Sequence, residues 1–328
     1  ASMFFGGISG SAAADTSSLG SILIPIMKEN GYDGEFSTAV TMASSVQGIL
    51  IPPSHNMVIY ALAAGSVSIG RLFLAGLVPG ILLGVALMIY SYYVSVKRDY
   101  PVGDKFNLKV ALKATWDALL GLGTVLIVVI GVISGVFTAT ESAAIACIYA
   151  FIITFFVYRE IPMSEMWNIL GKSIKTLSVV MILTGTATAF GWLVAYLQIP
   201  AIITNAILGI SQNKYIIMLI INILLLLLGT SINMVSIILI LTPILLPVVT
   251  SIGIDPVHFG VIMILNLGIG LLTPPVGTVL FIGSAISGIK IETLSKAMIP
   301  FYIVMIIVLL IITYIPQVVM FLPNLLMP

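Results

Sequence analysis

The residues with the clearest potential for chemistry are a small polar group inside the most apolar part of the chain. Gly229-Thr-Ser-Ile-Asn233 lies within Tyr215–Ile254, a run without a charged residue. As one straight helix this run would be about 60 Å long, whereas the hydrocarbon core of a bilayer is about 30 Å thick. We therefore expect the chain to turn back at Gly229 and to form a re-entrant hairpin with its tip near the middle of the membrane. Backbone at that depth is tolerated where it is buried in protein or lines a cavity, so the tip is expected to belong to a binding site.

Two proline pairs provide a second kind of polar element. Pro52-Pro53 is followed by Ser54-His55-Asn56, and Pro274-Pro275 is preceded by Thr273. Because proline lacks an N–H group and disfavours helix in the residue before it, each pair predicts a helix broken inside the membrane. The carbonyl groups freed around Ile51–Pro53 and Thr273–Pro275, together with hydroxyl groups of the tips, suit a hard cation such as Na⁺.

The new helix N-termini after Pro53 and Pro275 suit an anionic carboxylate, because their N–H groups carry partial positive charge. The residues expected to face that substrate are Ser54, His55, Asn56, Gly277 and Thr278.

Asp15 and His55 each allow two interpretations. Asp15 follows Gly10 by five positions and is an intramembrane carboxylate. Such groups are usually functional, so a role in binding the substrate or an ion is preferred over a simple charge at a helix N-terminus. His55 comes directly after the first break, where a ligand or proton role and a packing role remain equally open.

The chain also repeats itself. A shift of 222 positions, from residue 25 to residue 247, superposes Pro25 on Pro247 and Pro52-Pro53 on Pro274-Pro275. The same shift places Gly7 on Gly229, Ser9 on Ser231, Gly31 on Gly253, Asp33 on Asp255 and Gly48 on Gly270. The first residues therefore resemble the second part of a hairpin like the later one, and its first arm is expected to begin upstream of residue 1.

The elements that position these residues must be membrane helices. The 328 residues are 60% hydrophobic and 8% charged, with a mean hydropathy of +1.22. This composition predicts an all-α polytopic membrane protein. The sequence contains no HExxH, GxSxG or P-loop motif, and its single cysteine, Cys147, predicts neither a disulfide nor a metal site. We expect a secondary transporter that is driven by an ion gradient, and not an enzyme. We expect it to lie in a lipid bilayer and not to bind nucleic acid.

The charge distribution predicts how the helices cross the membrane. One broken helix and the spans 72–96, 119–137, 142–158 and 174–197 separate the hairpins, which is an odd number of crossings. All basic residues except Arg71 and Lys214 then fall on one face, which the positive-inside rule makes cytoplasmic. The expected fold is an inverted repeat with two re-entrant hairpins and two broken helices, as in secondary transporters. The expected parts are a first half of the transport domain (1–70), scaffold or arm helices (71–213), a second transport half (214–290) and a C-terminal span (291–328).

Several motifs of the chain resemble those of a known family. Gly6-Gly-Ile-Ser-Gly-Ser-Ala-Ala-Ala-Asp15, Leu23-Ile-Pro-Ile-Met27 and Ile51-Pro-Pro-Ser54 resemble the large membrane subunit of tripartite ATP-independent periplasmic (TRAP) transporters. Gly135–Ala144 is similar to the family's Gly-x-x-Thr-Pro-Thr-Glu-x-Ala signature, with Ala139 in place of the proline. The resemblance covers the whole chain, is nearest to the sialic-acid members, and leaves the family's first spans without a counterpart.

The resemblance implies an elevator-type mechanism in the bacterial inner membrane, coupled to two or more Na⁺ ions. It implies uptake of an organic acid, with sialic acid first and a C4-dicarboxylate second. It also implies a small four-helix membrane subunit, fused or separate, and a periplasmic binding protein that delivers the substrate. Carried over by position, one Na⁺ site comprises Ser9, Gly10, Ser11, Pro52 and Ser54, and the other comprises Gly229, Thr230, Asn233, Thr273 and Pro275.

Two other functions would fit the same residues. A stand-alone Na⁺/dicarboxylate symporter of related fold would need no binding protein. An ion channel could also use hairpins, although it would need a continuous polar lining, and this chain has polar residues mainly at the tips and breaks.

Overall fold

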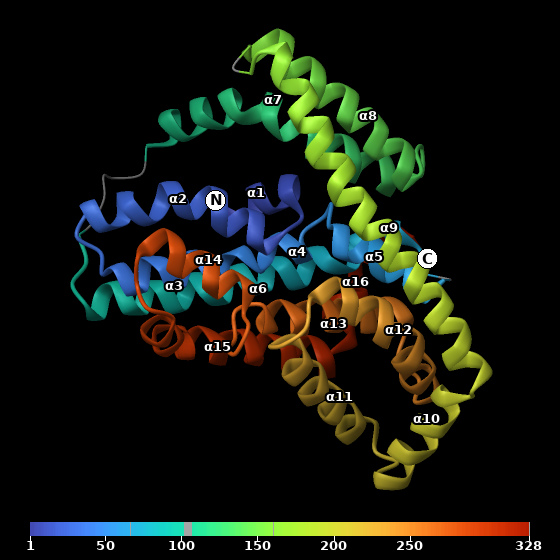
Figure 1. Ribbon diagram of the computed structural model, residues 1–328. Helices are drawn as coiled ribbons and strands as arrows, with labels where there is room; N and C mark the ends of the chain where they lie inside the picture. Colours follow the sequence, from blue (N-terminus) through green and yellow to red (C-terminus); the bar gives the residue numbers. More distant parts are fainter. Residues whose placement is uncertain (66, 102–106, 160, 328) are drawn as a thin grey trace. The chain divides into compact units, whose positions relative to one another are not determined.

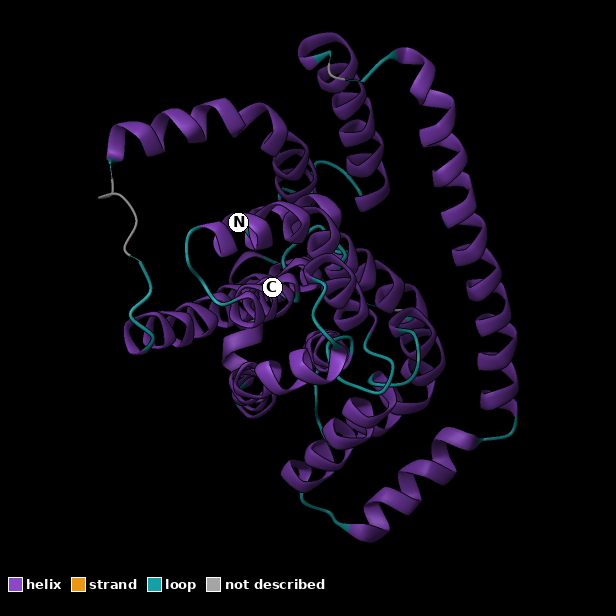
Figure 2. Cartoon of the chain, turned by 60° about the vertical axis from the view of Figure 1, so that its left-hand side comes forward, coloured by secondary structure: helices purple, strands orange, loops and turns teal. Residues whose placement is uncertain are grey.

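The computed structural model describes residues 1–65, 67–101, 107–159 and 161–327, and within these ranges the chain forms helices and loops without a strand (Figure 2). Contacts divide the chain into two compact units, Ala1–Val102 with Val194–Pro328, and Gly103–Leu193. The helices of the first unit are α1 (Ser2–Ser9), α2 (Ala12–Glu29), α3 (Gly34–Ser45), α4 (Gln47–Leu50), α5 (His55–Ala64), α6 (Ile69–Lys97), α10 (Ile199–Ile210), α11 (Lys214–Gly229), α12 (Met234–Ser251), α13 (Pro256–Gly270), α14 (Thr278–Ser287), α15 (Ile291–Tyr314) and α16 (Pro316–Leu326).

The all-helical membrane class is confirmed. Stretches of the described chain that are long and apolar enough to cross a membrane are Ile69–Lys97, Ala139–Tyr158, Met163–Tyr196, Met234–Ser251 and Ile291–Tyr314. The sequence predicts a division of the chain at residues 70, 213 and 290 into two transport halves, scaffold or arm helices and a C-terminal span. This division into parts that would move against one another stays a prediction.

Helix boundaries repeat along the chain as the sequence does. The starts of α2, α3 and α6 recur at the starts of α12, α13 and α15 with the same shift of 222 positions, from 12, 34 and 69 to 234, 256 and 291. Both proline pairs lie outside helices, between α4 and α5 and between α13 and α14, and both Pro–Pro peptide bonds are cis. The two predicted helix breaks are therefore present.

The two halves of the repeat interlock. Helix α2 packs against α14, and its counterpart α12 packs against α5. Figure 1 shows α14, in orange, beside the blue helices α2 and α3, which it also contacts. In each half of the repeat, the second helix of the hairpin (α2 or α12) therefore packs on the helix that follows the break in the other half (α14 or α5). Both hairpin tips thus belong to the same compact unit.

Two helices of the first unit add detail to the predicted parts. Residues 199–213, within the range expected to hold scaffold or arm helices, contain α10, which packs on α12. In the predicted C-terminal part, 291–328, α15 ends at Tyr314 and a further helix, α16, begins with Pro316 and packs on α6. Proline at the first helical position removes an N–H group that has no intrahelical partner in any case, so Pro316 starts a helix instead of ending one.

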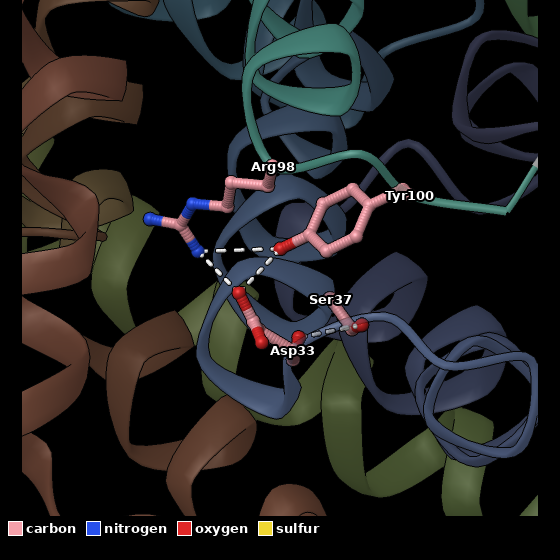
Figure 3. A network of polar contacts seen from close by, with 4 residues as sticks. All are labelled: Asp33, Ser37, Arg98 and Tyr100. Carbon is pink, nitrogen blue, oxygen red and sulfur yellow. Dashed lines mark hydrogen bonds and ion pairs between the residues drawn. The ribbon is translucent and has the colours of Figure 1, made fainter.

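A polar cluster ties the turn between α2 and α3 to the end of α6. The Asp33 carboxylate accepts hydrogen bonds of 2.6 Å from the Arg98 guanidinium and from the Tyr100 hydroxyl (Figure 3). The Tyr100 ring lies 4.7 Å from the Tyr32 ring and 5.4 Å from the Phe36 ring, measured between centroids. The hydrogen bond from Tyr100, followed by the one from Arg98, lowers the pKa of Asp33. The side chain of Asp33 therefore holds α6 and does not cap α3, although Asp33 precedes that helix.

The second unit consists of α7 (Leu108–Ile133), α8 (Ala139–Ile152), a π-helical turn (Ile153–Tyr158), a short 3₁₀ turn (Met163–Glu165) and most of α9 (Met166–Tyr196). Helices α7 and α8 pack together. Between them, the Thr138 N–H donates to the Glu141 carboxylate at 2.8 Å, and the Glu141 N–H donates to the Thr138 hydroxyl at 3.2 Å. This capping box fixes the start of α8, as expected for a threonine followed three positions later by glutamate.

Candidate functional site

The first hairpin tip lies against the first helix break. Helix α1 ends at Ser9, and Gly10 adopts a left-handed conformation with φ +60° before Ser11 caps α2. A Cβ added at Gly10 would lie 3.1 Å from the Pro53 carbonyl oxygen and 3.3 Å from the His55 nitrogen. Both the positive φ and the close approach favour glycine at this position, since it has no side chain.

The second tip meets the second break in a corresponding way. Thr230–Asn233 connects α11 to α12, and the Val276 N–H donates to the Thr230 carbonyl oxygen at 3.0 Å. The Asn233 side chain accepts from the Val235 N–H at 2.9 Å and so caps α12. The structure therefore brings each predicted tip to its predicted break.

Paired glycines bring each first arm close to its broken helix. A Cβ at Gly6 would lie 2.2 Å from the Gly48 Cα, and a Cβ at Gly270 would lie 2.5 Å from the Gly229 carbonyl carbon. Gly48 and Gly270 are related by the repeat, so both halves use the same position for this contact. Because the neighbouring atoms are backbone, a side chain at these positions would push the arm away from the broken helix.

The junctions offer oxygen atoms without acidic clusters. Among the described residues, the Pro52 and Pro53 carbonyl oxygens accept no hydrogen bond. The Ser54 hydroxyl donates to the Ile49 carbonyl at 2.7 Å, and the Thr273 hydroxyl donates to the Ile269 carbonyl at 2.8 Å, which leaves the lone pairs of both hydroxyls available. Within the same ranges no group of three or more His, Cys, Asp or Glu side chains could hold a metal ion. Neutral oxygen ligands of this kind fit a hard cation better than a soft one.

The predicted substrate residues divide by exposure. Helix α5 begins at His55 and α14 begins at Thr278, and both of these side chains are exposed. Ser54, Asn56 and Gly277 are buried. The exposed N-terminal side chains, not the buried ones, are therefore placed to meet a ligand from outside the fold.

Asp15 is fully buried in the first turn of α2. One carboxylate oxygen lies 3.5 Å from the Ser2 hydroxyl, and the other has no hydrogen-bond partner among the described residues. A Cβ at Gly48 would lie 3.7 Å from that second oxygen. The carboxylate thus lies against α1 and α4.

A buried polar cluster joins three helices of the first unit. The Asn266 amide donates to the backbone and side-chain oxygens of Asn222 at 3.0 and 2.9 Å, and the Asn222 amide donates to the Thr313 hydroxyl at 3.1 Å. These three residues lie on α13, α11 and α15 and are at most 3% exposed. The only sequence signal was the presence of amide side chains in apolar helices, which does not reveal their partners.

Comparisons with known proteins agree with the motifs. The family model described as "Tripartite ATP-independent periplasmic transporter, DctM component" matches residues 1–318. The isethionate TRAP transporter permease protein DctMQ of Oleidesulfovibrio alaskensis is 45% identical over 97% of this chain and 50% of its own length. The sialic acid TRAP transporter large permease protein SiaM of Vibrio cholerae is 41% identical over 99% of this chain and 76% of its own length. The C4-dicarboxylate TRAP transporter large permease protein DctM of Pseudomonas aeruginosa is 39% identical over 99% of this chain and 76% of its own length.

The chain thus spans between half and about three-quarters of the length of these relatives. The repeated hairpin-and-break elements, the motifs at Gly6–Asp15 and Gly135–Ala144, and the match over nearly all residues lead to one assignment. The chain belongs to the DctM family, the large permease component of tripartite ATP-independent periplasmic transporters.

Proposed function

We propose that this permease carries an organic acid into the cell by symport with Na⁺, using an elevator mechanism. The observation that carries the proposal is that each hairpin tip contacts one helix break. Gly10 lies against Pro53 at the first break, and Thr230 accepts a hydrogen bond from Val276 at the second. Each pair combines carbonyl and hydroxyl oxygens of a turn with carbonyl and hydroxyl oxygens of a helix break. Because both proposed cation sites lie in one packed unit, ion binding at either site would influence the movement of the whole unit in the elevator mechanism.

The proposed Na⁺ ligands are the oxygen atoms of the tips and breaks. The first site comprises Ser9, Gly10, Ser11, Pro52 and Ser54, and the second comprises Gly229, Thr230, Asn233, Thr273 and Pro275. Na⁺ bound there would add positive charge beside the N-termini of α5 and α14, and the substrate anion would be held by those N-termini with His55 and Thr278. The anion would then bind well only when Na⁺ is bound, which is the basis of coupling.

The substrate class is a small organic anion, with sialic acid as the first candidate and a C4-dicarboxylate as the second. The relatives named above transport sialic acid, C4-dicarboxylates or isethionate by name. A helix N-terminus binds the anionic group of a substrate and not the remainder of the molecule, so the same kind of binding site can serve all of these substrates. The partners would be a small membrane subunit and a periplasmic binding protein, in a bacterial inner membrane.

Reconstituted uptake tests the proposal. The full-length permease with its small subunit is placed in proteoliposomes, its cognate binding protein is added outside, and accumulation of labelled sialic acid, succinate and isethionate is measured. We expect one of these anions to accumulate under an inward Na⁺ gradient and accumulation to be lost when choline replaces Na⁺. Uptake that is equal in choline would contradict Na⁺ coupling. Equal uptake without the binding protein would instead favour a stand-alone symporter, and anion flux that only follows its own gradient would favour a channel.

A further inference from the structure

One tyrosine reaches the second helix break from outside the hairpin. The Tyr302 hydroxyl, on α15, donates to the Leu272 carbonyl oxygen at 2.6 Å. Leu272 and Thr273 are the two residues immediately before Pro274-Pro275. Tyr302 therefore contacts the backbone that turns from α13 into the break.

The same position in the first half of the repeat carries no side chain. The shift of 222 positions relates Tyr302 to Gly80 and Leu272 to Leu50. A Cβ at Gly80 would lie 2.6 Å from Ile51, so α6 packs directly on the first break there. The neighbouring glycine of α6, Gly76, likewise approaches the Leu50 carbonyl oxygen, which a Cβ would meet at 2.2 Å. The first break is thus held by close helix packing, whereas a hydroxyl group holds the second.

From this asymmetry we propose that Tyr302 is a positioning residue of the second cation site. Its hydroxyl occupies the Leu272 carbonyl and fixes the orientation of the break, so that the following oxygen atoms, from Thr273 onward, face the hairpin tip. The inference rests on the proposed Na⁺ function of that site. The simpler interpretation is that a part-buried tyrosine hydroxyl only satisfies a carbonyl that has no intrahelical partner.

A matched pair of variants separates these interpretations. Tyr302→Phe removes one hydroxyl and keeps the ring. Tyr314→Phe removes the equivalent hydroxyl from the same helix, where it donates at 3.1 Å to the Tyr215 carbonyl, at the start of α11. The full-length permease is purified, and its thermal unfolding midpoint is measured as NaCl replaces choline chloride at constant ionic strength.

In the unmodified protein we expect Na⁺ to raise the unfolding midpoint, because an ion that binds the folded state stabilises it. Tyr302→Phe should raise the Na⁺ concentration at half-maximal effect about fivefold, the change that corresponds to loss of one ordinary hydrogen bond. Tyr314→Phe should leave that concentration unchanged. If Tyr302→Phe lowers the midpoint in choline but keeps the Na⁺ dependence, Tyr302 only stabilises the fold and the proposal is wrong. If Na⁺ has no effect on the unmodified protein, the proposed Na⁺ function fails as well.

Discussion

A single methyl group at Gly270 should separate the second hairpin from its broken helix. A Cβ there would lie 2.5 Å from the Gly229 carbonyl carbon and 2.7 Å from its Cα and carbonyl oxygen. Carbon atoms in contact are normally about 3.5–4.0 Å apart, so Gly270→Ala requires the arm to move by about 1 Å. The reverse substitution, Gly229→Ala, is milder, because its closest approach is 3.3 Å.

The displacement has a consequence at the site. The hydrogen bond from the Val276 N–H to the Thr230 carbonyl is 3.0 Å long, and a shift of about 1 Å along it would exceed the limit for a hydrogen bond. Overpacking of this size costs about 1–3 kcal/mol. We therefore expect Gly270→Ala to lower the thermal unfolding midpoint and to raise the half-saturating Na⁺ concentration of uptake by about fivefold or more.

The assay needs a glycine without neighbours as its control. Gly185 on α9 is such a position, since a Cβ there meets no atom within 4 Å. Gly185→Ala should be neutral or stabilising by up to about 1 kcal/mol, the usual helix preference of alanine over glycine. If Gly270→Ala transports with the Na⁺ dependence and unfolding midpoint of the unmodified protein, the close contact of tip and break has no functional role and our reasoning is refuted.

The remaining predictions concern four other polar side chains. Asn222→Leu removes the side-chain acceptor of the Asn266 amide and the donor to the Thr313 hydroxyl, and leaves only the backbone carbonyl of residue 222 as a partner of Asn266. This should destabilise the fold by about 1–2 kcal/mol, measured by denaturation in detergent. The pKa of Asp33 is lowered in the fold, so its stabilising effect is present above the pKa of the unfolded chain and is lost as the pH falls through the folded pKa. Asp33→Asn should therefore lower the unfolding midpoint at pH 7, and this effect should fade only as the pH falls from about 4 toward the lowered pKa of Asp33. The change at pH 7 should be less than about 1 kcal/mol, because the carboxylate is more than half exposed. Thr230→Ala should weaken the Na⁺ dependence of uptake with little change in stability, whereas Asn233→Ala should affect both, because its side chain also caps α12.

Backbone features of the fold were predictable because their causes are local. The breaks at Pro52-Pro53 and Pro274-Pro275 follow from missing N–H groups, and the turn at Gly229 follows from the length of the apolar run. The repeat of 222 positions predicted that each hairpin tip lies near a helix break, because residues at matching positions in the two halves are expected to play matching roles. By contrast, the expected C-terminal span at 291–328 is divided between α15 and α16, and the position of α16 depends on its packing against α6, a helix distant in sequence.

Side-chain partners were not predictable in the same way. The bonds of Asn222 to Asn266 and of Tyr302 to Leu272 join helices that are distant in sequence, and no spacing rule relates them. Asp15 was expected near the substrate because a carboxylate in a membrane is costly, but its direction depends on the packing of α1 and α4. The role of each predicted site residue, including Asp15, stays a prediction.

Equilibrium binding of radioactive Na⁺ to the purified full-length permease measures the proposed cation sites themselves. We expect saturable binding of at least two ions, weakened at one site by Thr230→Ala and unaffected by Gly185→Ala. Binding that does not saturate, or that is the same in Thr230→Ala as in the unmodified protein, would contradict the claim that the tips and breaks hold Na⁺.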